Sequence, residues 1–458
     1  MAATLEHPSL RTTLTGIEKS VTTHFRGIPY GYIPRRFAAA EKLDQYPSEL
    51  QCTEYGPRCP QVPVDVGHLL RIPSSHIFPV EPEDEFNCVN LDVVLPKVYH
   101  QSESKLLPVL VWIHGTGGSQ AVTFGSAASG YRLNVFALGS DDGPPNLALR
   151  DQELALRWVQ DHISGFGGDP NKVTLAGESA GAVYCHAHLA IGSPVKQVIL
   201  SSGSLFLSPP QPRQKISALR DVVAKKLQDI DPVLDLEIAP ANRVIEAIKL
   251  AGLQSFFLEW EERLEGWQTR KGNSDRLLLS DVQKEATIWQ AGVWATGSSN
   301  ILDAFNAAGE YSKELKELYH IYPSRPSSCK TGALDFINDY KYLVDEYNPW
   351  QPSSGGHHAV DLPLLFAGFD LSFSRGAENV GRAMREAWIK FLNLQEPWSG
   401  ASEVSYGFGP HGMTKALDDW EIQARRRITQ TRRLDKMDCT LLDKTFVGLA
   451  AGKVSLLN

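Results

Sequence analysis

The chain has 458 residues, of which 42% are hydrophobic and 21% are charged, and its formal net charge is -8. The apolar content is sufficient for a large buried core, and the negative charge argues against nucleic acid or an anionic membrane as the main partner. No stretch approaches the roughly 20 apolar residues that cross a bilayer. The first residues do not resemble a secretory signal, so we expect a cytoplasmic protein, or a secreted one if the start of the sequence is mis-assigned.

Cysteines and basic residues give no sign of a metal or nucleic-acid site. The six cysteines are too sparse for a disulfide scaffold and lack zinc spacing, so we expect no metal. A basic cluster near the C-terminus has acidic residues close by, and we interpret it as a solvated helix face rather than a binding patch. The cluster consists of Arg425, Arg426, Arg427, Arg432 and Arg433.

Apolar runs alternate with helical patterns from about residue 85, which is typical of a mostly parallel sheet covered by helices. Residues 108–113 form a continuous apolar run and predict a strand buried on both faces. Residues 151–163 have helical spacing. Residues 173–176 and 195–200 predict two further strands.

The pattern becomes helical further along the chain. A cluster of prolines before residue 213 marks the start of helices predicted over residues 213–267. The last 30 residues predict a helix and a loose tail, so we assign residues 1–428 to one α/β domain and residues 429–458 to this tail. The aromatic residues predicted to be core rather than pocket are Phe256, Phe257, Trp260 and Trp267.

The strongest local motif is Gly-Glu-Ser-Ala-Gly at residues 177–181. It follows a predicted strand, and residues 182–191 can continue as a helix, which is the context of a nucleophile elbow. Glycines flank Ser179 because larger side chains would collide in so tight a turn. The amide of Ala180 would face a developing oxyanion at the helix N-terminus. The motif therefore predicts Ser179 as a nucleophile; the alternative is an ordinary glycine-rich turn.

A serine hydroxyl needs a base, normally a histidine that a carboxylate orients. In one common chain order the acid follows the serine and the histidine comes last. His358 lies in a glycine-rich loop, and Glu285 follows the apolar residues 277–279 by a short loop. Chemistry alone does not select these two among the 13 histidines and the many carboxylates.

A second set of backbone donors is suggested by residues 112–118, Trp-Ile-His-Gly-Thr-Gly-Gly, directly after a predicted strand. Amides in such a loop can complete an oxyanion hole. A glycine-rich loop after a strand can also bind phosphate, but this one lacks GxGxxG spacing and the lysine of a P-loop. We therefore interpret it as an oxyanion loop.

At these residues the chain resembles the type-B carboxylesterases, the family that includes cholinesterases and fungal lipases. The resemblance runs from about residue 25 to residue 427 and is closest in look to the fungal members. Its most specific part leads from residue 166 into the motif at 177–181. The segments that carry it are 25–30, 55–61, 85–91, 166–171 and 280–285.

The resemblance implies an α/β-hydrolase fold, with a mostly parallel central sheet flanked by helices and with helical insertions after the nucleophile strand. It also implies a catalytic triad of Ser179, Glu285 and His358. His358, rather than His357, matches the family's histidine because Asp361 follows it by three positions.

The resemblance further assigns the oxyanion hole to the backbone amides of Thr116, Gly117 and Ala180, although the family usually has glycine in place of Thr116. It also implies that Cys59 and Cys88 match a family disulfide. In a reducing compartment these two would stay thiols, which is what we expect. No cysteines match the family's second disulfide.

The chain departs from the family just before Tyr131. The family has a longer segment there that carries a central strand, whereas here only residues 127–130 remain. Deleting a central strand would expose two rows of backbone groups, each costing about 1–3 kcal/mol if buried unpaired. We expect either a truncated product or a sheet rebuilt around the gap.

Together these observations predict a carboxylic ester hydrolase that acts on a small-molecule ester through an acyl-serine intermediate and needs no cofactor. The same residues leave three alternatives open. The chain could be a catalytically weak or inactive, cholinesterase-like binding protein of the neuroligin type. It could be an acyltransferase that uses the same triad, or a peptidase or amidase.

Overall fold

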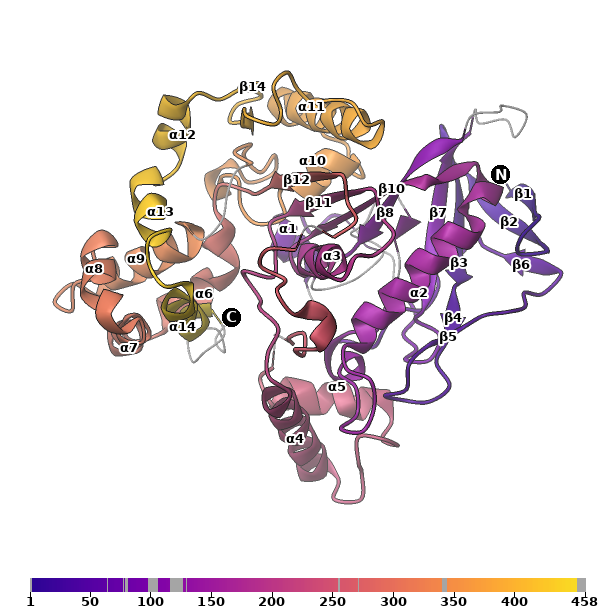
Figure 1. The fold of residues 1–458 in the computed structure, drawn as a ribbon, viewed down its shortest axis with the longest axis horizontal. Helices are drawn as coiled ribbons and strands as arrows, with labels where there is room; N and C mark the ends of the chain where they lie inside the picture. Colours follow the sequence, from indigo (N-terminus) through magenta and orange to yellow (C-terminus); the bar gives the residue numbers. More distant parts are fainter. Residues whose placement is uncertain are drawn as a thin grey trace. The chain divides into compact units, whose positions relative to one another are not determined.

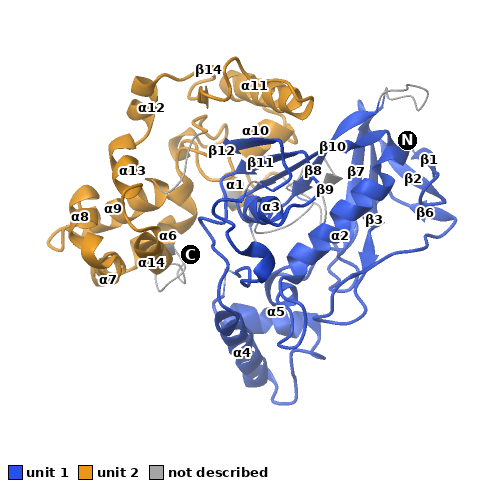
Figure 2. Ribbon diagram, viewed as in Figure 1, with its two compact units in different colours: residues 1–66, 77–279 blue, residues 67–76, 280–458 orange. Residues whose placement is uncertain are grey.

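The structure is a computed structural model that describes residues 2–63, 65–76, 78, 81–97, 106–115, 127–128, 130–253, 256–270, 272–339 and 344–450. The chain forms two compact units (Figure 2). The first contains residues 1–66 and 77–279, and the second contains residues 67–76 and 280–458. Each unit has its own cluster of buried apolar side chains.

A five-stranded sheet with the order β12-β11-β10-β8-β9 carries the strands predicted from the apolar runs, and β8, β10, β11 and β12 are labelled in Figure 1. β10 lies parallel to β8 on one side and to β11 on the other. Every residue of β11 is buried, which explains why such strands are continuous apolar runs rather than alternating ones. The strands are β8 (Leu107–Ile113), β9 (Ala127–Ala128), β10 (Gly168–Glu178), β11 (Gln197–Ser201) and β12 (Arg276–Ser280).

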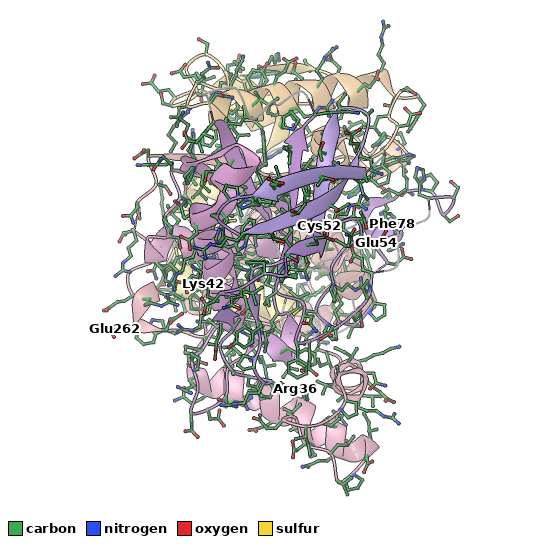
Figure 3. All side chains as sticks on the ribbon, turned by 90° about the vertical axis from the view of Figure 1, so that its right-hand side faces the viewer. Arg36, Lys42, Cys52, Glu54, Phe78 and Glu262 are labelled. Atoms are coloured by element: carbon green, nitrogen blue, oxygen red, sulfur yellow. The ribbon has the colours of Figure 1, made fainter. Side chains whose placement is uncertain are left out.

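A second five-stranded sheet, of the order β1-β2-β3-β7, is built from the N-terminal strands, and β6 pairs with β2. The pairs along this order are antiparallel. Cys52, labelled in Figure 3, directly follows β6 and is fully buried. The strands are β1 (Ala2–His7), β2 (Thr12–Glu18), β3 (Thr22–Pro29), β6 (Glu49–Gln51) and β7 (Asn90–Pro96), and a separate pair is formed by β4 (Gly31–Tyr32) and β5 (Glu41–Lys42).

The two sheets are separated between β7 and β8, where the sequence lacks the expected strand. On the edge of β8 that faces away from β10, β9 pairs with only two residues, Val111 and Trp112. The amide of Gly130 donates to the carbonyl of Asn90 on β7 at 2.7 Å. Among the described residues, two pairs between β8 and β9 and one hydrogen bond from Gly130 to β7 therefore occupy the place where a full strand would pair with both β7 and β8. Residues 116–126 and 129 lie outside the described residues.

Restoring a strand-forming segment of family length between residues 126 and 131 is expected to stabilise the chain. Each buried backbone group of β7 or β8 that gains a partner would contribute about 1–3 kcal/mol. Thermal unfolding with and without the insert measures this, and a glycine-serine insert of equal length is the matched control. Equal melting temperatures for the parent chain and the strand-forming insert would show that the prediction is wrong.

The helices of the first unit only partly match the expected boundaries. The long helix expected over residues 151–163 begins earlier, at Leu147, because Leu147 and Leu149 are both fully buried. The helical segment expected over residues 213–267 ends at Leu250, followed among the described residues only by a 3₁₀ turn. The helices are α2 (Leu147–His162), α3 (Ala180–Ile191), α4 (Arg213–Ile230) and α5 (Ala241–Leu250), and the 3₁₀ turns are Asn134–Ala137, Ile163–Phe166 and Glu262–Leu264.

The four aromatic residues predicted to be core behave differently from one another. Trp267 is buried, and Phe256 and Phe257 pack against the core while remaining partly exposed. Trp260 is 52% exposed, so the prediction was wrong for this residue. It lies in the irregular segment after α5, where no helical face directs its side chain inward.

Two buried ion pairs fasten loops to the core of the first unit. Arg132 forms a bidentate pair with Asp151 of α2, with Nη2–Oδ1 at 2.6 Å and Nε–Oδ2 at 2.8 Å. Arg36, labelled in Figure 3, donates from Nε to Glu85 at 2.6 Å. Removing one partner of such a pair would leave an uncompensated buried charge. Arg132 thus anchors the segment between Gly130 and the 3₁₀ turn Asn134–Ala137 to α2.

The second unit is mainly helical, with one small antiparallel pair of strands, β13 (Tyr406–Phe408) and β14 (Thr414–Ala416). No helix in the described ranges is long and apolar enough to cross a membrane. The α-helices are α1 (Val66–Leu70), α6 (Gln290–Ala295), α7 (Ser298–Asn306), α8 (Ser312–Leu318), α9 (Pro326–Asp339), α10 (Asp361–Phe366), α11 (Arg375–Leu392), α12 (Asp419–Arg425), α13 (Ile428–Leu434) and α14 (Cys439–Ala450), and the 3₁₀ turns are Glu285–Trp289, Gly309–Tyr311 and Pro352–Ser354.

The C-terminal basic cluster is only in part the solvated face expected from the sequence: Arg432 and Arg433 are exposed, whereas the other three arginines are not. Arg425 and Arg426 contact the two oxygens of Asp345, whose side chain is 4% exposed, at 3.0 and 2.7 Å. Arg427 donates to Asp339 of α9 at 2.8 Å. These three arginines are half-buried partners of internal carboxylates. The nearby acidic residues noted in the sequence do not include Asp339 and Asp345, which are distant along the chain.

Candidate active site

Ser179 occupies the turn between β10 and α3, and its backbone is strained. It has φ 56° and ψ -123°, a conformation that residues with a side chain rarely adopt. The turn is fixed on both sides, because the Ser179 amide donates to Ser201 of β11 at 2.9 Å and the Ser179 carbonyl accepts from Val183 at 3.1 Å. Strain of this kind at a strand-to-helix turn is a feature of nucleophile elbows.

Glycines make this turn possible. A Cβ on Gly177 would lie 2.5 Å from the carbonyl carbon of Gly181, and a Cβ on Gly181 would lie 2.1 Å from the carbonyl oxygen of Ile113 at the end of β8. Sequence reasoning missed Gly203, where a Cβ would lie 2.1 Å from the Ser179 carbonyl oxygen. No local pattern marks Gly203, because its neighbour in space is 24 residues away in the chain.

The predicted oxyanion residues are described only in part. The amide of Ala180 opens α3, where the helix N-terminus favours negative charge. Thr116 and Gly117 lie outside the described residues. The start of their loop passes close to the nucleophile turn, since a Cβ on Gly115 would lie 2.8 Å from the carbonyl oxygen of Glu178.

The described residues on either side of the segment that contains Thr116 and Gly117 contact each other. The rings of His114 and Tyr131 stack with centroids 4.3 Å apart, and the Tyr131 hydroxyl donates to the carbonyl of His114 at 2.7 Å. Burial lowers the pKa of His114 to about 4, so this ring is neutral at pH 7. His114 and Tyr131 thus form a buried, uncharged contact within the first unit.

Glu285 and His358 lie in the second unit and contact each other directly. Glu285 starts the 3₁₀ turn that follows β12, and its Oε1 accepts from the amide of Val282 at 3.0 Å. Its Oε2 pairs with Nδ1 of His358, and the two residues are 1% and 5% exposed. A histidine held this way carries its proton on Nδ1 and leaves Nε2 available as a base.

A second carboxyl group lies beside this pair. Asp361, at the start of α10, is fully buried, and its Oδ1 has no hydrogen-bond partner among the described residues. Burial and the charge of Glu285 raise the pKa of Asp361 to about 6, against the opposing effect of His358. In the sequence, Asp361 served only to identify His358 by its spacing, and we predicted no function for Asp361 itself.

The two adjacent histidines have different surroundings. His358 contacts Glu285, whereas the ring of His357 bonds to Asn348 and to the His358 carbonyl. The geometry therefore favours His358 as the partner of the carboxylate. Ser179 and Ala180 belong to the first compact unit, and Glu285 and His358 belong to the second.

Cys59 and Cys88 are both buried in the first unit as free thiols, and they donate to the carbonyl oxygens of Pro60 and Glu85 at 3.7 and 3.6 Å. Contact with Cys59 and burial raise the pKa of the Cys88 thiol well above its usual range. A further bond runs from the Leu133 amide to the Cys59 sulfur at 3.3 Å. These thiols thus contribute to the packing around Leu133.

Comparison with known proteins places the chain in a family. A family profile described as "Carboxylesterase family" matches residues 10–230. Lipase 1 of Yarrowia lipolytica is 30% identical over 85% of this chain and 87% of its own length. Para-nitrobenzyl esterase of Bacillus subtilis is 26% identical over 84% of this chain and 88% of its own length.

Solved structures agree on the fold. A thermophilic para-nitrobenzyl esterase superposes with a TM-score of 0.69 at 21% identity, covering 94% of this chain and 99% of that one. The predicted α/β-hydrolase fold is thereby confirmed. From the similarity to the Yarrowia lipase over most of both chains, we conclude that this protein belongs to the carboxylesterase family and is a carboxylic ester hydrolase.

Proposed function

We propose that hydrolysis proceeds through an acyl-serine intermediate, with Ser179 as nucleophile, His358 as base and Glu285 as the group that orients His358. The observation that carries this proposal is the strained backbone of Ser179 between β10 and α3. The buried contact between Glu285 and His358 supports the assignment of the base and of the carboxylate that orients it. Family membership supports the same assignment.

In the first half-reaction, Ser179 Oγ attacks the ester carbonyl carbon while its proton passes to Nε2 of His358. The tetrahedral intermediate then collapses, and the alcohol leaves with that proton. In the second half-reaction, water attacks the acyl carbonyl carbon while its proton passes to Nε2. The tetrahedral intermediate then collapses, the proton returns from Nε2 to Ser179 Oγ, and the acid is released. Glu285 stabilises the imidazolium through Nδ1–H and stays ionised. The oxyanion is proposed to bind the amide of Ala180 together with those of Thr116 and Gly117.

A fluorophosphonate probe tests the nucleophile directly, because it phosphonylates an activated serine and not an ordinary one. The probe should modify the chain once, and peptide mass spectrometry should locate the adduct at Ser179. Ser193, a buried serine just after α3, serves as the internal comparison. An adduct elsewhere, or no adduct in enzyme that hydrolyses esters, would contradict the assignment.

The substrate is proposed to be a small-molecule ester. Turnover of para-nitrophenyl esters of graded acyl length would define the acyl preference. Adding a short-chain alcohol to the same assay separates hydrolysis from acyl transfer, since a transferase would form a new ester at the expense of free acid.

A further inference from the structure

The side chain of His357 lies in a closed network that includes the backbone of its neighbour. Its Nδ1 lies 2.7 Å from the carbonyl oxygen of His358, and its Nε2 lies 2.8 Å from Nδ2 of Asn348. His357 is 2% exposed and Asn348 is fully buried, so water does not compete for these bonds. All of these atoms lie in the second unit.

The orientation of the Asn348 amide follows from its other partners. Its Oδ1 accepts from the backbone amides of Trp350 and Gln351 at 2.9 and 2.8 Å. Its Nδ2 therefore points the other way and has two hydrogens to donate. One goes to the carbonyl oxygen of Leu70 in α1 at 2.8 Å, and the other goes to Nε2 of His357.

This arrangement determines where His357 carries its proton. Because Nε2 accepts from Asn348, the proton of the neutral ring is on Nδ1, which donates to the His358 carbonyl. The ring is neutral at pH 7, since burial lowers the pKa of His357 to about 4. Every donor and acceptor of the His357 ring and the Asn348 amide is thus used in one consistent pattern.

The bond to His358 restrains a strained turn. The next residue, Ala359, has φ 65°, a value that favours glycine, and the amide of Val360 donates to the His357 carbonyl at 3.0 Å. The His358 carbonyl belongs to the peptide that enters this turn. Holding that carbonyl fixes the backbone of His358, and therefore the direction in which its imidazole leaves the chain.

We propose that His357 is a positioning residue for His358. Asn348 holds the His357 side chain, this side chain fixes the backbone of His358, and the fixed backbone orients the His358 imidazole. This inference rests on the proposed role of His358 as the base. Since an error of about 1 Å in the position of a reacting group can cost about 100-fold in rate, the effect is expected in kcat rather than in KM.

Two substitutions separate the two functions of the His357 ring. In His357→Asn, the amide Nδ2 takes the place of the ring Nδ1 and can still donate to the His358 carbonyl. In His357→Gln, the amide reaches the place of Nε2 and can accept from Asn348, but no donor remains for His358. We expect His357→Gln to lower kcat by about 10- to 100-fold at unchanged KM, and His357→Asn to stay within about 3-fold of wild type.

Urea unfolding measures the stability of both variants. If His357 had a purely structural role, both substitutions would lower the free energy of unfolding and their kcat values would not differ. If His357→Gln does not fold, His357→Leu, which likewise offers no donor to the His358 carbonyl, replaces it, and the same fall in kcat at unchanged KM is expected. Equal kcat for His357→Asn and the donor-free variant would overturn the inference, as would a wild-type kcat for folded His357→Leu. His358→Gln identifies the other failure: if it keeps wild-type activity, the proposed base is wrong.

Discussion

Ser179→Ala is expected to lower kcat for ester hydrolysis by about 10⁴-fold or more, while the fold remains intact. The hydroxyl is the proposed attacking group, and neither the Ala180 amide nor the Glu285–His358 pair can replace it. Alanine occupies the same space and adopts the same backbone at least as well as serine. The change should therefore affect chemistry and leave the melting temperature close to that of wild type.

The measurement is steady-state turnover of a chromogenic ester by purified variants with matched melting curves. Ser193→Ala is the control, because Ser193 is also buried and bonds only to Nδ1 of His188 through its side chain. That variant should keep its kcat even if it loses some stability. Substantial turnover by Ser179→Ala, beyond trace wild-type contamination, would disprove the assignment.

Acidification is expected to destabilise the protein steeply between about pH 6.5 and pH 4, because several histidines are buried in neutral form. Their folded-state pKa values lie below the usual 6.5, so the stability they contribute is complete above pH 6.5 and is lost as the pH falls toward the folded value. At pH 5 each costs about 2 kcal/mol. Burial lowers the pKa of His7, His114, His186 and His357 to about 4 and that of His188 to about 3.

Several buried carboxyl groups act in the opposite direction, and the pKa is raised most for Asp92 and Asp361. Burial raises the pKa of Asp92 to about 7 and that of Asp361 to about 6, so each takes up a proton more readily in the folded state and stabilises it as the pH falls. Five histidines have strongly lowered pKa values and two carboxyl groups have strongly raised ones, so we expect a net loss of stability as the pH falls.

His188→Gln tests this account at a single site. His188 is fully buried between Ser193 and Gln152, and glutamine keeps hydrogen-bonding groups without titrating. The loss of unfolding free energy between pH 7 and pH 5, measured in urea, should be about 2 kcal/mol smaller in the variant. His76→Gln, at an exposed position, is the matched control substitution. An unchanged pH dependence in His188→Gln would refute the explanation.

Local patterns predicted the parallel strands well, because a strand buried on both faces must be apolar at every position. Residues 108–113 and 195–200 became β8 and β11 with shifts of one or two residues. The same reasoning failed after α5, where the described residues up to 267 contain a 3₁₀ turn and no α-helix, and Trp260 is exposed. A cluster of aromatic residues predicts neither a helix nor a buried face unless the residues recur with helical spacing.

The basic cluster and the sheet division show the limits of local reasoning in another way. Arg425, Arg426 and Arg427 were interpreted from their neighbours in the chain, whereas their partners are Asp345 and Asp339. The short segment before Tyr131 was recognised in the sequence as a departure from the family. That the two sheets separate there, with β9 bridging only two residues of β8, became known from the tertiary structure.

The nucleophile turn is the part of the site that the sequence by itself determined. Residues 177–181 contain both the serine and the glycines, and the steric conflict that requires those glycines arises within five residues. Glu285 and His358 came from the family resemblance, because no local rule joins side chains that are 73 residues apart. Only the tertiary structure brought those two into contact, and only it revealed that Asn348 and His357 hold the backbone of His358. Backbone strain is a property of neighbouring residues, whereas a buried hydrogen-bond network depends on where the fold returns distant segments.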